Sequence, residues 1–230
     1  NRMKFRLNLV ALGFVASSTA CAGGSLRLQN PSPILDMDRT VLRASGENPF
    51  PATSTVFFEW RVDAPDLQLD GDGYARLQDP DRARLDLFTG DNEAVLSAGL
   101  VEDELWAREE RALDFVPSPA LLWAFLGTFR PGEDATRLYG EFDGDDFRLD
   151  YGLPNGDELQ YLFRSGRIAQ VEVHQEGHAV HRVLLAWGGG RELPSEATYR
   201  NLSSRSQLKV AVGTVERVDS HPSDIWYLVP

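Results

Sequence analysis

The sequence predicts a mainly β protein with few helices, built on one antiparallel sheet of about ten or eleven strands. Three observations carry this prediction. Apolar and polar residues alternate along many short segments, turn-forming residues separate consecutive segments, and one short helical segment is apolar on nearly every side. No segment between the strands has the length that a parallel crossover needs. A sheet of this many strands must curl or split.

The first element is a secretory leader over residues 1–20. Arg2, Lys4 and Arg6 precede an apolar run of about ten residues, and small residues follow that run, which is the order of a signal peptide. A helix needs about 20 apolar residues to cross a bilayer, and no comparable run follows. The leader therefore predicts export, and Met3 is a candidate start of translation.

Cys21, the single cysteine, follows the leader directly. An unpaired thiol is a liability in an oxidising compartment, and lipidation of Cys21 would remove it. The stretch ASSTACAGG (16–24) resembles the lipobox of bacterial lipoproteins, in which the thiol receives a diacylglycerol and the new terminal amine is acylated with a chain such as palmitate. It departs from that pattern at Ser18, where Leu is usual. The alternative is an ordinary secretory cut among these small residues.

The chain after the leader is strongly acidic. Three of the 23 Lys and Arg residues lie in the leader, so 35 Asp and Glu face the remaining 20 cations, a net charge of about −15. Such a surface repels nucleic acid and anionic lipid headgroups. We expect no nucleic-acid partner, and membrane attachment through the acyl chains on the N-terminus.

Small and polar residues continue as far as residue 32, so residues 21–32 are predicted to be a lipidated cysteine with a flexible tether. Residues 33–230 then suit a single domain, which we expect to be a monomer. Within residues 33–51, apolar residues have helical spacing until Gly46 and two prolines end the pattern. This segment predicts one short amphipathic helix.

Strand alternation begins after Ser54. It recurs in segments 55–62, 83–88, 147–153, 159–163, 169–173 and 208–214. Turn signals lie at QDPD (78–81), TGDN (89–92), LPNGDE (153–158), RSGR (164–167), QEGH (175–178) and GGGRELP (188–194). The segments LDGDGY (69–74) and FDGDDF (142–147) look like fragments of calcium loops, but neither continues to a full ligand set, and we interpret both as turns.

Residues 118–132 interrupt the strands. Ser118 is a candidate N-cap, Pro119 suits the first helical position, and Pro131–Gly132 is a stop, so a helix is predicted from Pro119 to Phe129. A helix that is apolar all round is buried or has an apolar partner. We expect it in the mouth of the curled sheet, against an aromatic face. The alternative is a plain core helix with no ligand.

The order of these elements, the segment GYARLQDPDRARLDLF (73–88) and the closing segment 193–230 together resemble the Lol-type (LolA/LolB-like) lipoprotein carriers and receptors and the uncharacterised outer-membrane lipoproteins related to them. The resemblance implies an open antiparallel half-barrel lidded by short helices, with an apolar concave face that receives the acyl chains of lipoproteins. The receptor's protruding apolar loop has no counterpart here, because the matching turn at 89–93 is short and polar. Handover in the strict receptor sense is therefore not expected.

The expected function is that of an outer-membrane lipoprotein on the periplasmic face of the envelope, which binds acyl chains or lipoproteins without a cofactor and without bond chemistry. Ala22 follows Cys21. By the best-known sorting rule, a residue other than Asp at this position favours the outer membrane. Reversible burial of hydrocarbon would be gated by movement of residues 119–129. The residues expected to contact the ligand are Phe58, Trp60, Leu85, Leu87, Leu122, Phe125, Leu126, Phe129, Tyr151, Tyr161 and Phe163.

Two other functions remain open. A structural or adaptor envelope lipoprotein would have a filled core. A metal-dependent hydrolase would use the hairpin at VEVHQEGHAVH, where His174 and His178 flank a turn and Glu172 shares a face with His174. The spacing is not that of a helical zinc motif, and no nucleophile elbow, P-loop or dinucleotide-binding pattern appears, so we expect neither a metal site nor an enzyme.

Overall fold

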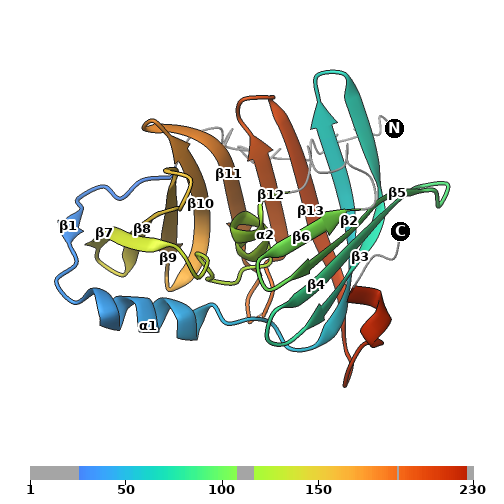
Figure 1. The fold of residues 1–230 in the computed structure, drawn as a ribbon, viewed down its shortest axis with the longest axis horizontal. Helices are drawn as coiled ribbons and strands as arrows, with labels where there is room; N and C mark the ends of the chain where they lie inside the picture. Colours follow the sequence, from blue (N-terminus) through green and yellow to red (C-terminus); the bar gives the residue numbers. More distant parts are fainter. Residues whose placement is uncertain (1–25, 108–116, 191, 227–230) are drawn as a thin grey trace, which may run out of the picture.

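A computed structural model describes residues 26–107, 117–190 and 192–226. These residues form thirteen strands of one antiparallel sheet, two α-helices and a short 3-10 helix (Figure 1). The strand order is β1-β7-β8-β9-β10-β11-β12-β13-β2-β3-β4-β5-β6, so β1 and β6 are the edges and the barrel is not closed. The mainly β, open antiparallel architecture is confirmed. The leader, Cys21 and the first residues of the predicted tether lie outside the described residues.

The elements have the following bounds. The helices are α1 (Met37–Glu47), α2 (Pro119–Phe125) and the 3-10 helix η2 (Ser223–Trp226). The strands are β1 (Ser32–Pro33), β2 (Ser54–Ala64), β3 (Leu67–Gln78), β4 (Arg82–Thr89), β5 (Ala94–Val101), β6 (Glu104–Ala107), β7 (Thr136–Asp143), β8 (Asp146–Gly152), β9 (Glu158–Arg164), β10 (Arg167–Gln175), β11 (His178–Ala186), β12 (Glu196–Asn201) and β13 (Ser206–Arg217).

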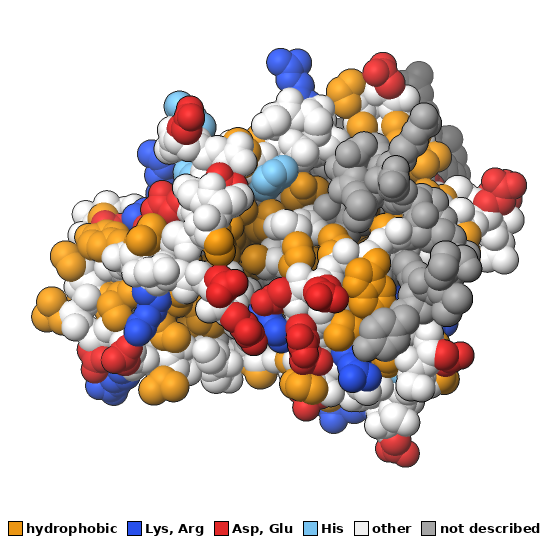
Figure 2. Space-filling model, in the orientation of Figure 1, with side chains coloured by type: hydrophobic (Ala, Val, Ile, Leu, Met, Phe, Trp, Pro, Cys, Tyr) orange, Lys and Arg blue, Asp and Glu red, His pale blue; other side chains and the backbone are white. Residues whose placement is uncertain are grey.

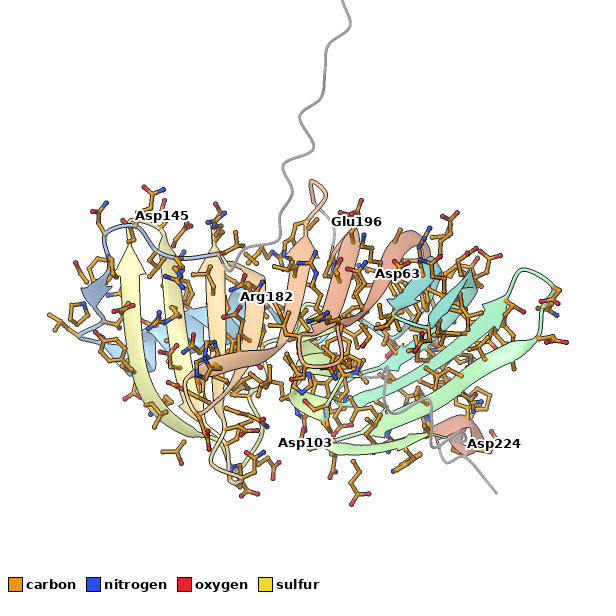
Figure 3. The ribbon with its side chains drawn as sticks, turned by 90° about the horizontal axis from the view of Figure 1, so that it is seen from above. Asp63, Asp103, Asp145, Arg182, Glu196 and Asp224 are labelled. Atoms are coloured by element: carbon orange, nitrogen blue, oxygen red, sulfur yellow. The ribbon has the colours of Figure 1, made fainter. Side chains whose placement is uncertain are left out.

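The sheet curls so that one face of every strand lies inside a trough (Figures 1 and 3). Side chains that were predicted to alternate along each strand point alternately into and out of this trough. Along β2, Val56, Phe58 and Trp60 are buried, while Phe57 and Glu59 between them are exposed. Helix α2 lies in the trough in front of β11 and β12. Helix α1 runs beside the ends of β7–β10 (Figure 1).

The segment LDGDGY is not a turn, because it forms the middle of β3. Its two glycines allow close approach, Gly71 to the backbone of β4 and Gly73 to the Phe58 ring of β2. A Cβ on Gly71 would lie 2.0 Å from the carbonyl oxygen of Phe88, and one on Gly73 would lie 2.4 Å from the ring of Phe58. The Trp60 indole Nε1 donates to the carbonyls of Asp72 (3.0 Å) and Phe88 (3.1 Å). The other acidic segment, FDGDDF, does turn, with Gly144 at φ +63° between β7 and β8.

One strand departs from simple alternation. The pairing of β10 with β9 shifts register between Ile168 and Gln170, which is a β-bulge. Ile168 is therefore fully buried in the core, while Ala169, predicted to share a face with Val171 and Val173, is only partly buried.

Residues 26–33, which we call the N-terminal strap, lie against the outer face of the sheet. The Leu26 amide donates to Oε1 of Gln170 on β10 (2.8 Å). The amides of Gln29 and Asn30 donate to Oδ2 of Asp143 (2.9 and 3.0 Å), and β1 pairs with β7. Most of the described part of the predicted tether is thus held on the domain. Among the described residues, no helix has the length and hydrophobicity needed to cross a membrane.

Gly71 lies against the backbone of β4, so adding a Cβ there should cost more stability than at a strand glycine with open space beside it. Gly71→Ala forces a Cβ into the backbone of β4 and is expected to destabilise the fold by about 1–3 kcal/mol. Gly213→Ala is the matched control, because its Cβ would meet nothing closer than 3.4 Å. Chemical denaturation of both variants measures this. Equal midpoints for the two variants would contradict the role of Gly71.

Candidate functional site

Helix α2 is held in the trough by groups at both of its sides. Pro119 occupies the first helical turn after Ser118, as predicted. The Trp123 indole donates to the carbonyl of Glu102 (3.0 Å), and the Phe50 ring packs edge-on against Trp123 at 5.4 Å between ring centroids. After the helix, the Phe129 amide donates to the carbonyl of Asn48 (3.0 Å). Residues before β2 and after β5 therefore fix its place.

The helix ends earlier than predicted, at Phe125 and not at Phe129. The cause is Gly127, which has φ +81°. The Gly127 amide donates to the carbonyl of Ala124 (2.8 Å) and the Thr128 amide to that of Trp123 (3.0 Å), which is a Schellman ending. A Cβ at Gly127 would also lie 2.6 Å from the Trp187 ring. The predicted stop at Pro131–Gly132 was wrong because Gly127 acts first.

An apolar cavity lies between α2 and the inner face of β2–β5, β12 and β13. The cavity volume is about 50 Å³, and all the empty space between the lining residues, open solvent at the mouth included, is about 640 Å³. It is lined by Val56, Phe58, Ala75, Leu77, Ala83, Arg84, Leu85, Ala98, Leu100, Leu122, Phe125, Leu126, Leu193, Pro194, Ala197, Val210 and Val212. Figure 2 shows hydrophobic side chains in the hollow at the centre of this face.

Among the described residues of this lining, Arg84 is the one that is charged, and its guanidinium is engaged outside the cavity. It donates to Asp86, to the carbonyl of Ile225 (2.8 Å) and to Ser97 (3.1 Å). Asp86 and Ser97 lie on the outer face, where η2 packs. The cavity can therefore bury hydrocarbon but offers little to a polar ligand.

The predicted ligand-contacting residues divide into two sets. Phe58, Leu85, Leu122, Phe125 and Leu126 line the cavity. The remaining six do not: these are Trp60, Leu87, Phe129, Tyr151, Tyr161 and Phe163.

Comparison with known proteins gives no match to a protein family or to a curated protein sequence. Solved structures do match. The crystal structure of a LolA superfamily protein from Nitrosomonas europaea superposes with a TM-score of 0.55 over 83% of this chain and 97% of that chain, at 13% identity. The fold is LolA-like. A structure from Vibrio parahaemolyticus, described as a "putative outer membrane lipoprotein-sorting protein domain", covers 82% of this chain and 94% of its own, with a TM-score of 0.49 and 8% identity.

The resemblance inferred from the sequence is thus confirmed at the level of the fold. Within this LolA-like half-barrel, the half formed by β7–β11 is filled by rings. Phe129 projects from the end of the α2 segment and packs against Tyr161 (4.9 Å between centroids), Phe163 (5.5 Å) and Tyr151 (6.1 Å). Burial raises the pKa of Tyr151 to about 12 and that of Tyr161 further, so both phenols stay neutral. This aromatic half is packed.

Several cavity residues were not predicted as ligand contacts. Ala98 and Leu100 come from β5, and Leu193, Pro194, Ala197 and Val210 come from β12, β13 and the loop before β12. The predicted alternation of segment 208–214 puts Val210 and Val212 on the same face of that strand. What the sequence could not show was that β13 pairs with β2, which brings the end of the chain beside Phe58.

Two of the three hairpin histidines, His174 and His181, have separate partners. Nε2 of His174 lies 2.9 Å from Oε2 of Glu172, and Arg182 donates to Oε1 of the same carboxylate (2.5 Å), all on the outer face. Nδ1 of His181 instead contacts the hydroxyl of Tyr199 (3.1 Å). Among the described residues, no group of three or more His, Cys, Asp or Glu side chains could hold a metal ion. This arrangement gives the hydrolase alternative no support.

A buried carboxyl on the outer face of β8 makes stability depend on pH. Burial raises the pKa of Asp150 to about 6, against the opposing effect of Arg148, whose Nε lies 3.0 Å from Oδ1. Glu158 and Glu141 also raise it. Because the folded state holds this proton more tightly than the unfolded state, the contribution is stabilising at low pH. It is lost as pH rises from about 4 to 6.

Asp150→Asn is expected to remove this loss of stability with rising pH, because Asn does not titrate. Between pH 4 and pH 7 the free energy of unfolding of the variant should gain about 2–3 kcal/mol relative to that of the wild type, since one unit of pKa corresponds to about 1.4 kcal/mol. Urea denaturation of both proteins at several pH values measures the difference. Parallel pH profiles would contradict the assignment.

Proposed function

We infer that this protein is a lipid-anchored envelope lipoprotein that buries acyl chains, free or carried by lipoproteins, in the cavity beneath α2. It acts by binding and release, with no bond chemistry and no cofactor. In this proposal residues 33–230 form one monomeric domain, Cys21 carries the acyl anchor, and the protein resides at the periplasmic face of the outer membrane.

The observation that carries the proposal is the cavity itself. The lining residues that the structure describes are apolar apart from Arg84, whose charge is engaged on the other face. The cavity lies under a helix whose residues Leu121 to Phe125 are all buried. Each methylene group moved from water into such surroundings contributes about 0.8 kcal/mol. A chain of several methylenes is therefore the ligand class that this lining favours.

The enclosed volume requires α2 to move for a ligand to bind. About 50 Å³ is far below the 300 Å³ or so of an ordinary ligand site. Leu122, Phe125 and Leu126 form the α2 side of the cavity, so displacement of α2 widens it directly. The contacts that oppose this displacement are those of Trp123 with Glu102 and Phe50. Movement of residues 119–126 would then gate the site.

The packed aromatic half supports the structural alternative. There Phe129 already fills the space that rings of β8 and β9 would offer a ligand. If α2 never opens, the protein is an envelope lipoprotein with a filled core that presents its surface to partners.

Lipid binding distinguishes these functions. The mature chain with Cys21→Ser, purified from cells, is expected to retain acyl lipid in native mass spectrometry. Ala98→Leu places extra carbons in the cavity and should abolish retention while leaving thermal stability unchanged or higher. Leu162→Ala is the control, because Leu162 is buried but lies outside the cavity lining. It should cost about 2–5 kcal/mol of stability and keep the lipid. A lipid-free wild-type chain would support the structural role instead.

Metabolic labelling with a radioactive fatty acid tests the anchor. The full chain is expected to incorporate label, and Cys21→Ser to incorporate none, because the thiol is the acylation site in the lipobox that 16–24 resembles. An unlabelled wild type would mean that the leader is removed by an ordinary secretory cut.

A further inference from the structure

Asn48, the first residue after α1, is buried and joins three separate segments. Its backbone amide and its side-chain Nδ2 both donate to the carbonyl of Ala44 (3.0 Å each), and Nδ2 also donates to the carbonyl of Gly166 (2.8 Å). Oδ1 accepts from the Ile168 amide (3.0 Å), and the Asn48 carbonyl accepts from the Phe129 amide (3.0 Å). The end of α1, the β9–β10 turn and the segment after α2 therefore meet at this residue. A buried polar network with all its members bonded fixes one arrangement.

The β-bulge of β10 connects Asn48 to Trp187. The Ile168 amide bonds Oδ1 of Asn48, and the Ile168 carbonyl accepts from Nε1 of Trp187 (2.7 Å). Bulges redirect strand residues in this way. The Trp187 ring in turn lies against Gly127, where a Cβ would be 2.6 Å from it. Asn48 and Trp187 are thus both held by Ile168, and they contact the α2 segment at Phe129 and Gly127. We call residues 127–129 the pivot.

A second connection joins α1 to the pivot. Nη1 of Arg167 donates to the carbonyl of Glu47, the last residue of α1 (2.7 Å). The Arg167 guanidinium also lies over the Trp187 ring, 4.8 Å from its centroid, which is a cation–π contact. The end of α1 therefore reaches the pivot through both Asn48 and Arg167.

The two parts of the α2 segment differ in what a hydrocarbon ligand could replace. Leu122, Phe125 and Leu126 face the cavity with apolar surface, and an acyl chain offers equivalent contacts. At the pivot the Phe129 amide bonds a buried carbonyl, and hydrocarbon cannot satisfy an amide that loses its partner. Opening by an acyl ligand is therefore confined to the residues before Gly127.

We propose that Asn48 is the positioning residue of the α2 gate, because its side chain keeps the pivot fixed while residues 119–126 move. This rests on the proposed function, since the movement that it confines is the opening proposed there. Through Asn48 the docking of α1, in the packed half of the trough, sets how far the cavity in the other half opens.

Amide hydrogen exchange tests the role of the side chain. It is measured by NMR on the lipid-free mature chain with Cys21→Ser, which is the reference chain. There the Phe129 amide is expected to exchange as slowly as that of Val210 in the middle of β13. Asn48→Ala removes the side-chain bonds but keeps the carbonyl of residue 48 that accepts from Phe129. Relative to Val210, exchange at Phe129 should become about tenfold faster or more.

Leu162→Ala is the matched control for a general loss of stability, because Leu162 is buried on β9 outside this network. Lower global stability speeds both amides by the same factor, so the ratio of Phe129 to Val210 exchange should stay that of the reference chain. If Asn48→Ala also leaves this ratio unchanged, the role of Asn48 is merely structural and the proposal is overturned.

Trp187→Phe decides the question if Asn48→Ala does not fold. This variant keeps a ring beside Gly127 and removes the bond from Nε1 to the carbonyl of Ile168. The ratio of Phe129 to Val210 exchange should then rise about threefold. A ratio equal to that of the reference chain would contradict the proposal.

Release of a pyrene-labelled fatty acid into phosphatidylcholine vesicles separates this inference from the proposed function. Asn48→Ala should release the probe about tenfold faster than the reference chain, and Leu162→Ala should release it at the reference rate. If the probe binds but Asn48→Ala releases it at the reference rate, the cavity stands and Asn48 does not position the gate. If the reference chain binds no probe, the proposed function fails, and hydrogen exchange still decides whether Asn48 fixes the pivot.

Discussion

The exposed inner face of an unclosed sheet is the constraint on which the rest of this structure depends. A closed barrel shields its interior with its own strands, but here β1 and β6 remain separate edges, so other elements must cover the apolar side chains that alternation places inside. Helix α2 covers the centre of the trough, and its sequence follows from that position. With strands on one side and the Phe50 ring on another, a polar face would have had no water to meet.

The two halves of the trough meet this constraint differently. In the β7–β11 half, rings from neighbouring strands and Phe129 fill the interior by edge-on contacts, which leaves a rigid packed core. In the other half the inner positions include Ala75, Ala83, Ala98 and Ala197, whose small side chains leave space under α2. Gly73 of β3 contributes as well, because it lets the Phe58 ring lie close to the strand backbone. Where hydrocarbon could enter is thus decided by side-chain size.

Much of the fold could be predicted from the sequence, since alternation and turn residues are local signals. The alternation of Val56, Phe58 and Trp60, the turns other than LDGDGY, and Pro119 at the start of α2 were placed correctly. Errors arose where tertiary packing changed a local preference. The acidic glycine segment forms the middle of β3, where Gly73 leaves room for the Phe58 ring, and Gly127 ends α2 through its positive φ, beside the Trp187 ring. The cavity could be predicted only in part, because pairing of β13 with β2 is a contact between distant segments.

The ending of α2 at Gly127 also limits what the trough could admit. Beyond this glycine, Phe129 is held by the carbonyl of Asn48 and by three rings, so that end of the segment is fixed while the seven residues before it lie over the cavity. A helix of seven residues is about 10 Å long. If α2 opens as proposed, a slot of about this length admits one or two hydrocarbon chains and is too small for a folded polypeptide. The protein part of a lipoprotein cargo would then stay outside, and selection would act on its acyl chains.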